Sequence, residues 1–224
     1  FPFEQAWYKN KGIDVQYFGH PIMEAKKNYI YEPLGYKGTA HIALCPGSRM
    51  QEIDRHMPII RQFIKKYSDN NENVNFTIVR APGVTQKALL SYLKGLRVSI
   101  EKRPILEVLQ GCHFAIVASG TATLESAITA RPIVVIYKMS WISWFITRRF
   151  VTIPFACIVN ILANKKIIPE LLQDDFTVNN IIKAVNIYKE KVARKNYAVE
   201  INKIINKLGD GSAYYKTAKY IINQ

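Results

Sequence analysis

The chain has 224 residues, with 31 lysines and arginines against 17 aspartates and glutamates, and a formal net charge of +14 at pH 7. Hydrophobic residues make up 49% and aromatic residues 12%, which excludes a disordered chain. Only 11 glycines and 10 prolines are present, which excludes a collagen-like one. The length suits one large domain, or one domain with an appendage, that buries its own core.

Cysteine usage and charge distribution narrow the class further. Cys45, Cys112 and Cys157 stand far apart and fit neither zinc-ligand spacing nor a disulfide framework. We expect buried, reduced thiols, as in a cytoplasmic protein. No apolar run is long enough to predict a membrane span. The basic residues alternate with aliphatic ones at helical spacing, so we expect no nucleic-acid partner and favour an anionic surface or substrate.

The chain begins with a stretch unlike the rest. It starts without methionine, and we expect a further segment before it. Residues 1–38 are predicted to be a lead-in between domains, with a short strand at 15–18 and an exposed connection at 24–38.

A regular alternation of strands and helices occupies residues 39–175. The predicted strands are solidly apolar, which favours a parallel sheet covered by helices on both faces. The sequence therefore predicts an α/β, Rossmann-like domain. The expected strands are 41–45, 75–81, 97–100, 113–119 and 131–137.

The remaining residues, 176–224, have a helical pattern throughout. We expect helices at about 177–192, 195–207 and 212–223. Just before them, Pro169 is predicted to open a short helix with Glu170 at its positive end.

Two loops follow predicted strands, where ligands bind in open parallel sheets. The first is PGSR: Gly47 allows close approach to a phosphate, Ser48 can cap the next helix, and Arg49 offers a fork of donors. Taken alone, this loop also fits an ordinary capped turn between strand and helix.

The second loop is SGTATLE. Ser119, Gly120 and Thr121 open a helix, and Glu125 lies one turn further, where a carboxylate can accept two hydrogen bonds from a ribose diol. A capping box is the alternative, but the spacing fits one imperfectly. Together the two loops predict a nucleotide diphosphate site. Walker and GxGxxG sequences are absent, which disfavours ATP hydrolysis and dinucleotide redox chemistry.

Three further features are open to two interpretations each. Asn160 lies among apolar residues and is either a ligand donor or a local cap. His20, in FGHP, lies where the chain crosses between domains and is a candidate site residue. The aromatic stretch 141–150 ends in two arginines and is either a membrane-surface helix or a buried helix over the cleft.

Several motifs in order resemble the lipid-A-disaccharide synthase family, glycosyltransferase family 19. They are FPFEQAWY, YFGHP, LCPGSRMQEI, VASGTATLESAI, RPIVVIYKM and VNILANKKIIPELLQ. The resemblance implies a GT-B fold, of which this chain is the C-terminal, donor-binding portion. The missing N-terminal domain would carry the acceptor site and the catalytic base, so this chain alone is expected to be inactive.

The resemblance also implies a reaction. The family transfers diacylglucosamine from UDP-2,3-diacylglucosamine to 2,3-diacylglucosamine 1-phosphate (lipid X) and releases UDP. It implies work on the cytoplasmic face of a Gram-negative inner membrane, as a peripheral protein, and a homodimer with swapped C-terminal helices. No DxD-like site is present, so we expect no cofactor and metal-independent chemistry.

The family's functional residues fall on matching positions of the two loops and of the segment around residue 160. Gly47, Ser48 and Arg49 are implied for the donor, and Arg49 also for stabilising the leaving group. His20 is a further candidate for the donor site because of its place between the domains. Asn160 matches the family's functional asparagine, although the chain has CIVN where the family has SLPN, and Asn164 where it has glycine.

The same implication covers the second loop. Ser119, Gly120 and Thr121 are implied as diphosphate contacts, and Glu125 as the ribose ligand. Two alternatives remain open: another GT-B transferase or UDP-sugar 2-epimerase, and a non-catalytic nucleotide-binding module.

Overall fold

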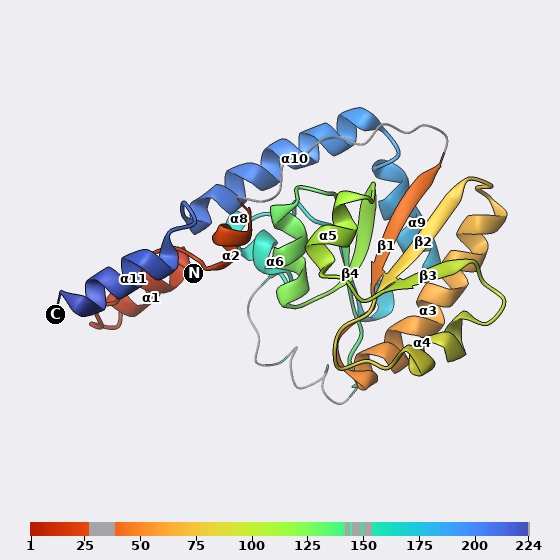
Figure 1. Ribbon diagram of the computed structural model, residues 1–224, viewed down its shortest axis with the longest axis horizontal. Helices are drawn as coiled ribbons and strands as arrows, with labels where there is room; N and C mark the ends of the chain where they lie inside the picture. Colours follow the sequence, from red (N-terminus) through yellow and green to blue (C-terminus); the bar gives the residue numbers. More distant parts are fainter. Residues whose placement is uncertain (27–38, 142–143, 145–148, 150–153, 224) are drawn as a thin grey trace.

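The computed structural model describes residues 1–26, 39–141, 144, 149 and 154–223. Its centre is a six-stranded, wholly parallel sheet with strand order β3-β2-β1-β4-β5-β6 (Figure 1). The strands are β1 (Ala40–Cys45), β2 (Val74–Val79), β3 (Val98–Glu101), β4 (Phe114–Ala118), β5 (Ile133–Tyr137) and β6 (Glu170–Leu172). The order reverses between β1 and β4, which is where open α/β sheets bind ligands.

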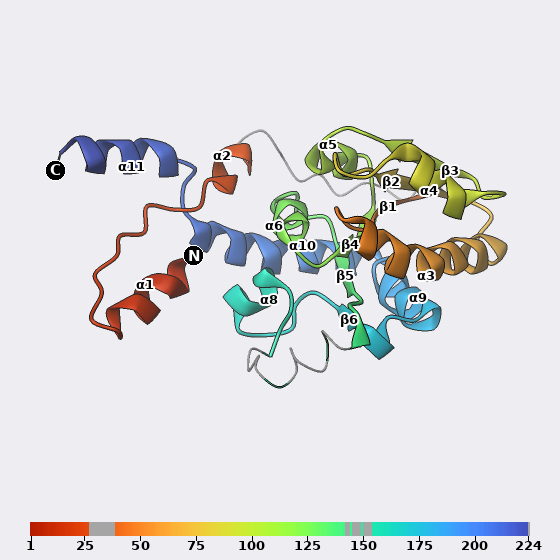
Figure 2. The ribbon, with the colours of Figure 1, turned by 90° about the horizontal axis from the view of Figure 1, so that it is seen from below.

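Helices connect the strands and cover both faces of the sheet (Figures 1 and 2). In the domain they are α3 (Met50–Asp69), α4 (Gln86–Leu93), α5 (Ile105–Gln110), α6 (Thr121–Ile128), α8 (Ile158–Ala163) and α9 (Val178–Ile187). One group comprises α3, α4 and α9, and the other comprises α5, α6, α8 and α10 (Lys191–Ile205). Because α9 packs on α3, the helical layer continues past residue 175.

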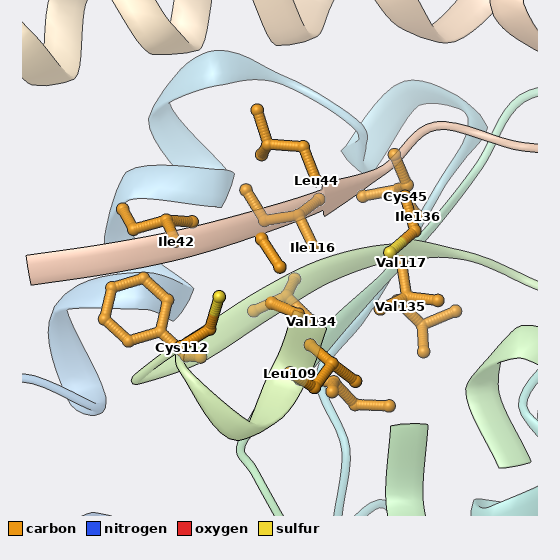
Figure 3. Close-up of a cluster of buried hydrophobic side chains, with 14 of the residues drawn as sticks. Ile42, Leu44, Cys45, Leu109, Cys112, Ile116, Val117, Val134, Val135 and Ile136 are labelled. Carbon is orange, nitrogen blue, oxygen red and sulfur yellow. The ribbon is translucent and has the colours of Figure 1, made fainter. Parts of the chain in front are cut away.

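The core lies on the two central strands. Figure 3 shows Ile42 and Leu44 of β1 beside Ile116 of β4, and all three side chains are fully buried. Burial on both faces explains why these strands are continuously apolar. The three cysteines are buried and free, and burial raises the pKa of the Cys112 thiol to about 11.

The two ends of the chain lie beyond the same end of the sheet (Figures 1 and 2). They carry α1 (Pro2–Lys9), α2 (Ile22–Lys26) and α11 (Ala213–Ile222). Gly19 and Gly209 cross there: both have positive φ, and a Cβ on Gly209 would lie 3.0 Å from the Gly19 Cα. The crossing therefore requires a residue without a side chain at position 209.

Two predicted elements were wrong. Residues 15–18 form no strand: Tyr17 instead donates its hydroxyl to the Leu208 carbonyl at 3.0 Å. Residues 170–172 form the edge strand β6, not the start of a helix, because they pair with the end of β5. Most of the aromatic stretch 141–150 lies outside the described residues. None of the helices in the described part of the chain is long and apolar enough to cross a bilayer.

Candidate functional site

A cavity of about 780 Å³ opens at the carboxyl edge of the sheet. The segments that follow β1, β2, β3 and β4 line it, together with the first turns of α3 and α6. Both loops singled out in the sequence, 46–49 and 119–125, meet there. The volume is in the range of small-ligand sites.

The loop after β1 is closed by a residue of the next helix. Gly47 has φ +131°, and the backbone N–H of Ser48 donates to the Glu52 carboxylate at 2.8 Å. The Arg49 guanidinium pairs with the same carboxylate at 3.3 Å. The expectation that Ser48 caps α3 was wrong, because the N-cap residue is Arg49.

The loop after β4 is held by residue 156 and lies at the cavity. The Ser119 hydroxyl donates to the Ala156 carbonyl at 2.9 Å. Gly120 has φ +151° and starts α6 without any side-chain cap. The first N–H groups of a helix have no partner within it, and here they lie at the cavity beside the exposed Thr121. This turn can receive an anion.

Glu125 lines the cavity one turn into α6. Its carboxyl is half-buried, and burial raises its pKa above the usual range. A carboxylate in this position is a hydrogen-bond acceptor only, so it suits a donor such as a sugar hydroxyl.

Three basic residues that the sequence analysis missed complete the wall. Arg80 follows β2, and Lys102 and Arg103 follow β3. With Arg49, they outnumber the two carboxylates that line the cavity, Glu52 and Glu125. Their position at or just after the ends of the strands predicted at 75–81 and 97–100 was the signal available in the sequence. The excess of positive charge favours an anionic ligand.

Asn160 is not among the residues that line the cavity. It is fully buried in α8, and its Nδ2 donates to the Ile168 carbonyl and to Glu170 Oε1, at 2.8 and 2.7 Å. Its Oδ1 accepts the backbone N–H groups of Ile167 and Ile168, both at 2.9 Å. The side-chain amide is thus fully used inside the protein.

Glu170 connects this buried amide to the loop after β4. It is 7% exposed and accepts the backbone N–H groups of Ala156 and Cys157 at 2.9 and 3.1 Å. The Ala156 carbonyl in turn accepts the Ser119 hydroxyl. The expectation that Glu170 serves a helix dipole was wrong, since its carboxylate holds residues 156–157 under the site.

Asn164 ends α8 in the left-handed region, with φ 51° and ψ 31°. Asparagine tolerates this conformation better than most residues with a side chain. The replacement of the family's glycine is therefore compatible with the turn that returns the chain to β6.

His20 lies apart from the cavity. Its ring stacks on Phe1 with 5.0 Å between ring centroids, and its backbone N–H donates to the Leu208 carbonyl at 2.7 Å. Partial burial lowers its pKa. It belongs to the crossing of the lead-in and the C-terminal tail. Among the described residues, no group of three histidine, cysteine or acidic side chains could hold a metal ion.

Comparison with known proteins identifies the family. The model of the lipid-A-disaccharide synthetase family matches residues 1–222. The chain belongs to this family. The lipid-A-disaccharide synthases of Anaeromyxobacter sp. (strain K) and Myxococcus xanthus (strain DK1622) are 31% and 30% identical to it over 99% of its length. The chain spans 60% of the length of each of these two relatives.

Solved structures show the fold. UDP-GlcNAc 2-epimerase from Neisseria meningitidis, bound to UDP-GlcNAc, matches with a TM-score of 0.58 at 14% identity, over 86% of this chain and 47% of that one. The calicheamicin glycosyltransferase CalG4 matches with a TM-score of 0.57 at 13% identity, over 88% and 46%. The Rossmann-like fold expected for the chain, a parallel sheet covered by helices, is confirmed.

The buried amide of Asn160 leads to a stability prediction. Asn160→Asp places a second carboxylate beside Glu170 in the interior, where neither has a cation partner in the interactions described above. We expect a loss of about 3 kcal/mol or more in the free energy of unfolding at pH 7. The loss should shrink toward pH 5, because the introduced carboxyl is buried and takes up a proton as the pH falls.

Urea denaturation at the two pH values measures this effect. Asn73→Asp is the matched control, because residue 73 is exposed before β2. Equal losses in the two variants would contradict the buried network.

Proposed function

We propose that this chain is the donor-binding portion of a lipid-A-disaccharide synthase and that its cavity holds the UDP group of an acylated glucosamine donor. The observation that carries the proposal is the meeting of two loops, 46–49 and 119–125, where the strand order reverses. Family membership supports the assignment to this transferase over the 2-epimerase alternative.

The diphosphate is placed between the first turn of α6 and the cationic wall of the cavity. Gly120 and Thr121 offer backbone N–H groups, and Arg49 offers the guanidinium of a side chain that is 80% exposed. The ribose diol faces Glu125. Ser119, whose hydroxyl is engaged by Ala156, shapes the turn.

The proposed reaction is an inverting displacement. A hydroxyl oxygen of lipid X attacks the anomeric carbon of the donor and loses its proton to a base, while the bond from that carbon to the diphosphate breaks. Negative charge then develops on the departing UDP. Donors placed in advance stabilise such charge, and Arg49 is the side chain suited to it. The base and the acceptor site are assigned to the part of the relatives that this chain does not span.

The proposal includes the family's partners. The excess of basic residues suits an anionic lipid surface, on which acylated substrates would be met. The exposed Tyr215 and Ile222 of α11, 69% and 81% exposed, suit a second copy of the chain. The cytoplasmic face of the inner membrane is the proposed location. A non-catalytic nucleotide-binding module is the alternative, because the chain spans only part of the relatives.

UDP binding tests the site. We expect saturable binding by calorimetry, and at least a tenfold weakening in Glu125→Gln, because neutral glutamine replaces a charged acceptor. Burial of the Glu125 carboxylate costs folding free energy, and a neutral glutamine avoids that cost. This variant should therefore unfold no more easily than the unsubstituted chain. Equal affinity of the two proteins for UDP would contradict the ribose assignment. Turnover of UDP-GlcNAc by the chain would favour the epimerase.

The role of Arg49 is tested in a chimera in which this chain replaces the matched segment of the Myxococcus xanthus relative. Once the chimera makes disaccharide, Arg49→Ala should lower kcat/KM by about 10²-fold, because a donor to the leaving group is lost. Lys87→Ala, outside the cavity on α4, is the control. A change of less than threefold in the Arg49 variant would contradict the role.

A further inference from the structure

We propose that Glu52 is a positioning residue for donor binding, which holds the loop after β1 closed and aims the guanidinium of Arg49 into the cavity without touching the ligand. This inference rests on the proposed function, because it assigns a part of the same site. It goes further because it assigns different contacts with the ligand to the two loops.

The carboxylate of Glu52 accepts three hydrogen bonds from one loop. Its Oε2 accepts the backbone N–H groups of Ser48 at 2.8 Å and Arg49 at 3.3 Å. Its Oε1 accepts the Arg49 Nη1–H at 3.3 Å. The Glu52 side chain is only 13% exposed, whereas that of Arg49 is 80% exposed. The protected carboxylate thus holds the backbone of Arg49 and one N–H of its guanidinium, while most of the Arg49 side chain is open to solvent.

Gly47 shows how tightly this carboxylate fills the turn. A Cβ at residue 47 would lie 2.5 Å from Glu52 Oε2 and 2.7 Å from Glu52 Cβ, closer than real Cβ contacts. Its φ of +131° also favours glycine. The concave side of the PGSR loop is therefore occupied by a carboxylate of the chain itself.

This arrangement changes how the first loop meets an anion. The N–H groups of Ser48 and Arg49 already donate to Glu52, so they do not face a ligand phosphate as free donors. The guanidinium of Arg49 has five N–H groups, and only one of them donates to Glu52 in this structure. The others remain for the diphosphate. The first loop thus supplies a side chain, whereas α6 supplies backbone N–H groups.

A double-mutant cycle on UDP binding separates this role from a merely structural one. The probe is UDP, titrated calorimetrically into the 224-residue chain and into the variants Glu52→Gln, Arg49→Ala and both together. If Glu52 acts through Arg49, Glu52→Gln weakens UDP binding about three- to tenfold when Arg49 is present. The same substitution then changes binding less than twofold in the Arg49→Ala background, because coupled residues are not additive.

Three results would overturn the inference. Equal weakening in both backgrounds assigns Glu52 a structural role only. Tighter binding in Glu52→Gln means that the carboxylate merely repels the diphosphate. Unchanged binding in Glu52→Gln means that the loop does not need it.

Controls keep these results apart from a failure of the proposed function. Absence of UDP binding by the unsubstituted, folded chain overturns the proposed function itself, and this inference with it. Glu72→Gln, at an exposed residue before β2, removes the same charge far from the cavity and should leave binding unchanged. Thermal unfolding reports whether Glu52→Gln folds. If it does not, Glu52→Asp enters the same cycle, since it keeps the charge but is too short to reach all three donors.

Discussion

The parallel pairing of β1 with β4 sets the position of everything in the candidate site. Leu44 pairs with Ile116 and Cys45 with Val117, so the two strands end at nearly the same level. Since the strand order reverses between them, the following segments leave toward α3 and α6. The PGSR and SGTATLE loops lie together because a register of fully buried side chains puts them there. A slip in that register would separate the loops and expose the core.

The site depends next on two carboxylates that hold its loops in place, those of Glu170 and Glu52. Glu170 holds residues 156–157, and the Ala156 carbonyl holds Ser119. Glu52 fills the turn at Gly47 on the other side of the cavity. Both carboxylates accept backbone N–H groups, which removes the cost of unpaired donors and holds two loop segments in place. The residues proposed to contact the donor are thereby left exposed in defined positions.

Much of this fold could be predicted from the sequence, because central strands buried on both faces are continuously apolar. The run HIALC predicted β1 and HFAIVA predicted β4. The strand β6 was missed because ELL is short and begins with a carboxylate, whose buried partner Asn160 is ten residues away. The strand expected at 15–18 was wrong for the opposite reason. Its pattern fits a strand, but the segment does not join the sheet, and Tyr17 donates its hydroxyl to the Leu208 carbonyl instead.

The loops of the site were predictable because glycine, hydroxyl and arginine residues follow apolar runs. The role proposed for Glu52 was not, since a carboxylate three residues after Arg49 fits a simple helix cap as well as a residue that positions the arginine side chain. Arg80, Lys102 and Arg103 were missed because single basic residues are common, and only the meeting of four strand ends gathers them into one wall.

A crystal structure of this chain with UDP tests the central claim most directly. The account predicts the diphosphate between the first turn of α6 and the Arg49 guanidinium, the ribose hydroxyls on Glu125, and Glu52 still bonded to the backbone of Ser48. A nucleotide bound elsewhere on the chain, or a diphosphate lying in the PGSR turn with Glu52 displaced, would contradict it.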